Sequence, residues 1–227
     1  MDLYIRLSEA FLESPGTVLS IHQLSRRLDI PYGTAYNRVH QLGEMGILRI
    51  VPQGKAKLCA LNPENPQTSA ILGLGAARKT SEALAAETHV AWLVSKLKAF
   101  LENRLSDHLH AALLLNAQAF LNQPSSVDRV PESDPAPAPS LDLFLILDES
   151  SFEDHDLEPT FHAFAPSSLQ PRITYMSVTP SSLLEMLRER ENEAGLSAYH
   201  MLHEGIILFG FERFFRLVIQ AFAPPRL

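Results

Sequence analysis

One acidic residue lies inside a strongly apolar stretch of this chain and raises the question of metal chemistry. Asp142 belongs to SLDLFLIL at 140–147, whose apolar run predicts a β-strand. Acids two residues apart on a strand share one face and can hold a divalent cation. The partner position is Ser140, and the upstream acid Asp134, in PESD, is separated from Asp142 by PAPAPS. A proline-rich segment is extended and stiff, so we expect no rebuilt metal site from Asp134 and Asp142.

Histidines form two further groups with metal-ligand spacing. His108 and His110 are two residues apart, which places them on one face of a strand. His200, His203 and Glu204 are spaced to share one face of a helix. Each supplies only part of the ligand set that zinc needs, with no evident third or fourth ligand nearby. The acidic run at 151–158 is expected to be a solvated loop. We therefore predict no metal and no cofactor.

The composition favours a folded protein in the cytoplasm. The 227 residues are 46% hydrophobic, which suits one large domain or two small ones. The apolar runs at 111–115 and 143–147 are far shorter than the roughly 20 residues of a membrane-spanning helix. No signal-peptide pattern is present at the N-terminus, and the single cysteine, Cys59, excludes an intramolecular disulfide.

Charge is distributed unevenly along the chain. Residues 1–62 contain seven Lys and Arg against five Asp and Glu, a net charge of +2. The remaining residues have a net charge of −9, which gives −7 for the whole chain. A mildly basic head on an acidic body indicates that only the head binds a polyanion.

The head is expected to begin with two helices. Residues 3–14 have apolar side chains at helical spacing, and Pro15-Gly16 ends this helix. After a short TVL strand, Ser20 and Gln23 match a capping box, in which each satisfies a backbone amide of the other. The second helix therefore starts at Ile21.

A third helix and a β-hairpin follow. The helix begins at Pro31 and stops at Gly46, and its buried face is expected to contain Ala35, Val39 and Leu42. ILRIV and AKLCAL then flank a turn at 52–55, which is typical of a hairpin. Three helices and a hairpin in this order are the elements of a winged helix-turn-helix.

The segment LSIHQLSRRLDIPYGTAYNRVHQLGEMGIL at 19–48 resembles winged helix-turn-helix regulators of archaea and bacteria. In that pattern a small residue, Thr, an apolar residue and Tyr open the recognition helix, and Leu-x-x-x-Gly-Ile/Leu leads into the wing. The resemblance covers nearly the whole head. It implies that residues 1–62 bind double-stranded DNA, with the third helix in the major groove.

The face of the third helix opposite the expected core carries side chains suited to DNA. Asn, Gln and Arg can bond base edges, hydroxyl groups can bind phosphates, and Asn37 and Arg38 are the best candidates for base reading. Two hairpin lysines would contact the backbone or minor groove. The predicted DNA-binding residues are Tyr32, Thr34, Asn37, Arg38, Gln41, Lys55 and Lys57. The alternative is an ordinary solvated face of a winged helix that binds protein.

The remainder predicts a linker and a second domain. NPENPQTS at 62–69 contains two Pro turns without periodicity, so we place a linker at 63–80 and a domain at 81–227. One long helix is expected over 81–105, interrupted near Thr88. Further elements follow in order: strands at HLHAALLLN, LDLFLILDE and RITYMSV, helices at 180–193 and 197–203, a GIILFG strand, and a closing helix FERFFRLVIQAF. The predicted class is α+β, a winged helix-turn-helix followed by an α/β domain with a small mixed sheet.

TPSSLLEMLRERE at 179–191 and YHMLHEGIILFGFERFFRLV at 199–218 resemble the C-terminal part of minimal nucleotidyltransferase domains. The resemblance covers roughly 90–227, and EGIILFG at 204–210 is its best-matched motif. Active members have Gly-Ser after the first strand, Asp-x-Asp on the second and a third carboxylate on the next, which together hold two Mg²⁺ ions. The corresponding residues here are Asn116-Ala117, Ser140-Leu141-Asp142, and Arg172 or Thr174. The resemblance therefore implies a domain without catalytic power, in which Asp142 is a relic of the metal site.

The prediction is a sequence-specific transcriptional regulator that is not an enzyme. Its body would serve dimerisation, contact with a protein partner or sensing of a small-molecule effector. A homodimer is expected because two half-sites increase specificity, with the helix at 81–105 as one dimer surface. The alternatives are an active, antitoxin-like nucleotidyltransferase that modifies protein or RNA through Asp134 and Asp142, and a protein-binding winged helix.

Overall fold

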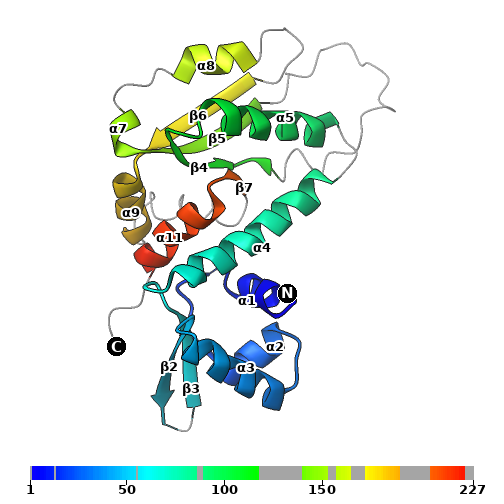
Figure 1. The fold of residues 1–227 in the computed structure, drawn as a ribbon, viewed down its shortest axis with the longest axis vertical. Helices are drawn as coiled ribbons and strands as arrows, with labels where there is room; N and C mark the ends of the chain where they lie inside the picture. Colours follow the sequence, from blue (N-terminus) through cyan, green and yellow to red (C-terminus); the bar gives the residue numbers. More distant parts are fainter. Residues whose placement is uncertain are drawn as a thin grey trace. The chain divides into compact units, whose positions relative to one another are not determined.

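The computed structural model combines helices with two small sheets in the part of the chain that it describes, as expected for an α+β protein (Figure 1). The described residues are 2–12, 14–54, 56–85, 89–117, 140–152, 157–164, 172–189 and 205–222. Among them, no helix combines the length and the apolar character needed to cross a membrane. The chain divides into two compact units, Met1–Arg78 with Leu184–Ala198 and Phe211–Leu227, and Lys79–Leu183 with Tyr199–Gly210.

The first unit contains the predicted three helices and hairpin. Its elements are α1 (Asp2–Leu12), β1 (Leu19–Ser20), α2 (Ile21–Arg27), α3 (Tyr32–Glu44), β2 (Leu48–Gln53), β3 (Ala56–Leu61), most of α4 (Pro66–Leu84) and α11 (Phe211–Phe222). The strands form an antiparallel sheet in the order β1-β3-β2. Large side chains of α1, α2 and α3, including Phe11, Leu24 and Leu42, are buried in its core.

The capping box predicted at the start of α2 is confirmed. The Ser20 hydroxyl accepts from the Gln23 amide at 3.2 Å, and the Gln23 side chain accepts from the Ser20 amide at 2.8 Å. These two bonds satisfy amides that the first turn of a helix leaves without partners. They place the start of α2 directly after β1, which pairs with β3.

The hairpin is also confirmed, with one correction to its turn. Gln53 pairs with Ala56, and Gly54 has φ +58, a left-handed conformation that glycine adopts without strain. Pro52, expected in the turn, lies in β2 and pairs with Lys57. A proline is tolerated there because β2 is an edge strand of this sheet.

The Pro turns expected within 62–69 are corrected in part, because α4 begins at Pro66 and continues through most of the segment assigned to a linker. Asn65 caps this helix: its side-chain oxygen accepts from the Gln67 amide at 2.9 Å. Pro66 is compatible with the first turn of the helix, where the backbone N–H makes no hydrogen bond within the helix. The sequence pattern thus assigns both Pro63 and Pro66 to turns, although Pro66 starts a helix.

Glycines let two helices approach α4 closely. A Cβ on Gly75 would lie 2.7 Å from Ser8 Cβ and 3.1 Å from Leu12 Cδ1 of α1. A Cβ on Gly73 would lie 3.0 Å from the Glu212 backbone nitrogen at the start of α11. The apolar face of α11 is buried, including Phe214, Phe215 and Val218.

The second unit contains a mixed four-stranded sheet, as predicted. Its elements are α5 (His89–Arg104), β4 (Leu109–Leu114), β5 (Ser140–Leu147), α7 (Glu149–Phe152), α8 (Leu157–Phe164), β6 (Arg172–Val178), the start of α9 (Pro180–Arg188), and β7 (Ile206–Phe209). The strand order is β6-β5-β4-β7, with β5 parallel to β6 and β4 antiparallel to both of its neighbours.

Three expectations for this unit need correction or fall outside the described residues. The segment 81–105 is divided between two helices, because 81–84 end α4 and His89–Arg104 form α5, which starts directly after the interruption expected near Thr88. The acidic run at 151–158, expected as a loop, includes the end of α7 and the start of α8. The helix expected at 197–203 lies outside the described residues.

One face of the sheet supports the core of the second unit. Alternate residues of β5, Leu141, Leu143, Leu145 and Leu147, pack with apolar side chains of α5 and α8. The acid of this strand, Asp142, is at an alternating position and belongs to the opposite face. The sheet thereby fixes the side from which Asp142 can be reached.

Candidate functional site

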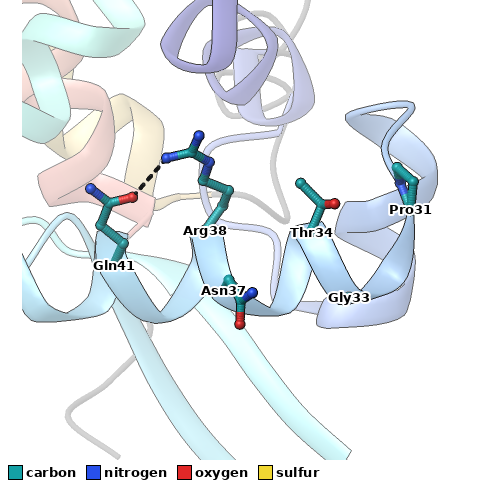
Figure 2. Close-up of a pocket in the computed structure, with 6 residues that line it drawn as sticks. All are labelled: Pro31, Gly33, Thr34, Asn37, Arg38 and Gln41. Atoms are coloured by element: carbon teal, nitrogen blue, oxygen red, sulfur yellow. Dashed lines mark hydrogen bonds between the residues drawn. The ribbon is translucent and has the colours of Figure 1, made fainter.

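The outward face of α3 forms an open, shallow hollow on the surface of the first unit. Ala35, Val39 and Leu42 are fully or almost fully buried, whereas the predicted DNA-binding residues of this helix are exposed. The lining residues are Pro31, Gly33, Thr34, Asn37, Arg38 and Gln41 (Figure 2). Four of the seven residues selected from the sequence therefore lie together in one place.

Helical geometry divides this face into a centre and a flank. At about 100° per residue, Asn37 points almost directly away from the buried Ala35, Val39 and Leu42. Thr34, Arg38 and Gln41 lie along one flank, and Figure 2 shows them on the same side of α3, with Asn37 pointing elsewhere. The Arg38 Nη1 donates to Gln41 Oε1 at 3.0 Å, so these two side chains present a joint array of donors.

The turn before α3 is held by a buried hydroxyl group. Ser25 Oγ donates to the Ile30 carbonyl at 2.7 Å, and the Ile30 amide donates to the Ser25 carbonyl at 3.1 Å. Between them Asp29 has φ +51, which is left-handed and uncommon for a residue with a Cβ. This closed turn sets the angle between α2 and α3.

The other end of α3 is fixed by the segment that the sequence assigned to a junction. Asn62 Nδ2 donates to the Gly46 carbonyl at 2.7 Å, and Asn65 Nδ2 donates to the Met45 carbonyl at 2.8 Å. Carbonyl groups at the end of a helix have no partner within the helix, so these bonds satisfy them. Both ends of α3 are thus anchored, which makes the helix a rigid support for its outward side chains.

The second flank of α3 carries aromatic rings that the sequence prediction did not include, apart from Tyr32. Ring centroids are 6.3 Å apart for His22 and Tyr32, 6.4 Å for Tyr32 and Tyr36, and 4.5 Å for Tyr36 and His40. Lys57 of β3 joins the end of this row, with Nζ 2.8 Å from the Tyr36 hydroxyl. The spacing of four residues along α3 was the available signal, but such spacing is also typical of a buried stripe. Lys55 lies outside the described residues.

Several positive charges of the head are engaged elsewhere. Arg6 donates to the Leu28 carbonyl at 3.0 Å and Arg27 to the Ala10 carbonyl at 2.6 Å, so both hold α1 against α2. Arg49 pairs with Glu64 at 3.2 Å. Among the described cations of residues 1–62, this leaves Arg26, Arg38 and Lys57 without an acidic or backbone partner. Electrostatic attraction of the head for a polyanion is therefore modest.

Comparisons with known proteins identify no family for this chain. It matches no protein-family model, no curated protein and no solved structure.

The second unit brings together three positions that the nucleotidyltransferase resemblance singles out. Asn116 Nδ2 donates to Asp142 Oδ2 at 2.9 Å, and the Asp142 amide donates to Asn116 Oδ1 at 3.2 Å. The Thr174 hydroxyl donates to Asp142 Oδ1. Both oxygens of the Asp142 carboxylate therefore accept a hydrogen bond, Oδ2 from the Asn116 amide and Oδ1 from the Thr174 hydroxyl. A neutral amide and a hydroxyl thus hold this carboxylate in place.

The other candidate ligands do not assemble a metal site in the described part of the chain. There, no group of three or more His, Cys, Asp or Glu side chains is close enough to share an ion. His110 Nδ1 lies 3.4 Å from Asp148 Oδ1, and His108 accepts from the Asp148 amide through its carbonyl at 2.9 Å. The remaining candidates, Asp134, His200, His203 and Glu204, lie outside the described residues.

Proposed function

We propose that this chain is a sequence-specific DNA-binding regulator of transcription. Its first unit is a winged helix-turn-helix, in which α2 and α3 form the helix-turn-helix and β2 with β3 forms the wing. α3 enters the major groove and its outward side chains read base edges, while the hairpin contacts the sugar-phosphate backbone. The second unit is a nucleotidyltransferase-like domain that serves dimerisation, partner contact or ligand sensing.

The observation that carries this proposal is the polar face of α3. Asn, Arg and Gln side chains are the ones that bond bases bidentately in the major groove, and Asn37, Arg38 and Gln41 are all exposed there. The helix is anchored at both ends. Its one acidic residue is Glu44, so little negative charge on α3 opposes the approach of DNA phosphates. A rigid, outward, nearly acid-free helix with these side chains is suited to a groove.

The non-catalytic role of the second unit is supported by the surroundings of Asp142. Two Mg²⁺ ions need several converging carboxylates, because the ions must offset the charge of a triphosphate. Here the positions around Asp142 supply an amide and a hydroxyl, which bind the carboxylate and bring no negative charge. Asp142 then has a structural role in joining β5 to β6 and to the end of β4.

The proposal is tested by selection and titration with the full chain. A library of random DNA duplexes is incubated with the protein, bound duplexes are sequenced, and affinity for the enriched duplex is measured by fluorescence anisotropy. We expect an enriched motif, and affinity at least about 10³-fold above that for a scrambled duplex. The plot of log K against log salt should be shallow, about −2 to −3 per protomer, because few cations are available.

Two variants separate the assigned face from the rest of the protein. Asn37→Ala removes the side chain at the centre of the face and should lose discrimination at one base pair. Lys98→Met removes a cation of α5 that pairs with Glu102 at 2.8 Å and should bind as the wild type does. No enriched motif, with a folded protein, would contradict the proposal, and nucleotide transfer abolished by Asp142→Ala would favour the enzyme instead.

A further inference from the structure

Lys57 is held between two side chains of α3. Its Nζ lies 2.8 Å from the Tyr36 hydroxyl oxygen and 2.9 Å from His40 Nε2, and 4.7 Å from the centre of the Tyr36 ring. An ammonium group has three N–H donors and no acceptor. His40 Nε2 must therefore accept, which places the proton of the neutral ring on Nδ1. The Tyr36 oxygen accepts as well.

These roles leave two donors available side by side. The Tyr36 hydroxyl still has its own proton to donate, and the Lys57 ammonium still has its third N–H. Among the described residues, neither donor has an acceptor and Lys57 has no ion pair. The two donor atoms are 2.8 Å apart, close enough to bind two oxygens of a single phosphate group.

The surroundings of this pair suit the backbone of a nucleic acid. Tyr36 is 37% exposed, so its hydroxyl can be reached from solvent. The pair lies between α3, whose centre carries Asn37, and the hairpin strand β3. A duplex that places a groove on α3 also places phosphates at the edges of that groove.

We propose that Tyr36 and Lys57 together bind one phosphate of the duplex backbone, and that His40 is a positioning residue that orients the Lys57 ammonium for it. The proposal rests on the proposed DNA-binding function and adds two residues, Tyr36 and His40, to the predicted set. It also gives Lys57 a fixed direction, so the contact is bidentate and depends on geometry as well as on charge.

The test is a double-mutant cycle on DNA affinity, measured with the full chain and its enriched duplex over a range of salt concentrations. Lys57→Met should weaken binding about tenfold and reduce the salt slope by about 0.9, because one phosphate contact is lost. Tyr36→Phe should weaken binding about tenfold without changing the slope, since it removes a hydrogen bond to a charged group and no charge. In the Lys57→Met background, Tyr36→Phe should cost about threefold or less, because the shared phosphate is no longer held.

His40 is tested by comparing two replacements. His40→Leu removes the acceptor and should weaken binding about threefold with an unchanged salt slope. His40→Gln can place an oxygen near the Nε2 position and should retain most of the affinity. Tyr4→Phe is the matched control, because the hydroxyl of Tyr4, in α1, contacts Met45 Sδ at 3.9 Å and takes no part in the proposed contact. Thermal unfolding of each variant verifies that the head remains folded.

The possible outcomes separate this proposal from the one on which it rests. If no duplex is bound by the wild type, the proposed function fails. If the wild type binds but Tyr36→Phe is equal to it, or Tyr36→Phe and Lys57→Met are additive, the shared phosphate site is wrong and the DNA-binding function stands. If His40→Gln loses as much affinity as His40→Leu, His40 is not the acceptor that positions Lys57.

Discussion

Arg38 donates to Gln41 Oε1 at 3.0 Å, less than one turn along the outward face of α3. The bond restrains a long side chain before any ligand arrives, which lowers the entropy lost when Arg38 binds a base. It uses one guanidinium donor and leaves the others, so bidentate contact with the N7 and O6 atoms of a guanine remains available. This pair therefore leads to a prediction on specificity.

Arg38→Lys should separate charge from geometry. A lysine retains the positive charge but not the planar fork, so discrimination at one base pair should fall about 10- to 100-fold while the salt slope is retained. Arg38→Ala should lose the same discrimination and also reduce the slope. Binding profiles on all single-base variants of the enriched duplex measure both effects. Uniform weakening across all positions would assign Arg38 to the backbone instead.

The close approach of α1 to α4 predicts a large effect of a small substitution. Gly75→Ala would bring a methyl group within 2.7 Å of Ser8 Cβ and into contact with the Ser8 hydroxyl oxygen. Ser8 lies in α1 and is fully buried. Overpacking of this kind destabilises by about 1–3 kcal/mol. Gly33→Ala is the matched control: no atom lies within 4 Å of the added methyl group. There the lower backbone entropy of the unfolded chain should increase stability by a few tenths to about 1 kcal/mol.

Urea unfolding measures both glycine variants. A loss of stability in Gly33→Ala equal to that in Gly75→Ala would show that the packing of α1 on α4 is not the cause.

Cys59 predicts a loss of stability at alkaline pH. The residue is fully buried in β3, and burial raises the pKa of its thiol to about 11, against an opposing effect of Lys57. The folded chain thus holds this proton more tightly than the unfolded chain does. Stability is unaffected below about pH 9 and falls as the pH rises toward 11, by roughly 2 kcal/mol at pH 10.5. Cys59→Val should lack this component, so its unfolding free energy should decrease less between pH 8 and 10.5.

If the unfolding free energies of the wild type and of Cys59→Val decrease equally between pH 8 and 10.5, other groups account for the loss of stability at alkaline pH. Alkylation provides a second measurement, because a thiol with a raised pKa reacts slowly in the folded state. Iodoacetamide should modify Cys59 at the rate of global or local opening, and much faster in urea.

At position 142 we expect the stability of the second unit to depend more on the shape and hydrogen bonding of the side chain than on its charge. Asp142→Ala leaves the Asn116 amide and the Thr174 hydroxyl without their acceptor and should destabilise the second unit by about 1–3 kcal/mol. Asp142→Asn should cost much less, because its carboxamide oxygen can accept from Asn116 and its NH2 group can donate to the Thr174 hydroxyl. Thermal unfolding of the wild type and of both variants, with and without Mg²⁺ and ATP, measures these differences in stability. A large stabilisation of the wild type by Mg²⁺ and ATP that Asp142→Asn abolishes would contradict a purely structural role.

Local signals predicted the first unit well because its elements are specified by neighbouring residues. The capping box at Ser20 and Gln23 and the alternation around Gly54 involve residues a few positions apart, so they can be recognised in the sequence. The same reasoning failed at Pro66, since a proline starts a helix as well as it ends one. The interruption expected near Thr88 agrees with the start of α5 at His89, but the sequence did not show that 81–84 continue the helix that begins at Pro66.

The site was predictable where one helix defines it and not where two elements meet. Ala35, Val39 and Leu42 identify the buried face of α3, and the opposite face follows from the helical period. The contact of Lys57 with Tyr36 and His40 depends on the packing of β3 beside α3, which no local pattern encodes. For the same reason the partners of Arg6, Arg27 and Arg49 could not be assigned, although they decide how much positive charge remains for DNA.

Modified DNA shows whether α3 reads bases from the major groove. Each purine of the enriched duplex is replaced in turn by its 7-deaza analogue, which removes the N7 acceptor that is accessible only in the major groove. We predict that one substitution weakens wild-type binding about tenfold and leaves the affinity of Arg38→Ala unchanged. Wild-type affinity that is insensitive to every 7-deaza substitution would contradict major-groove reading by α3.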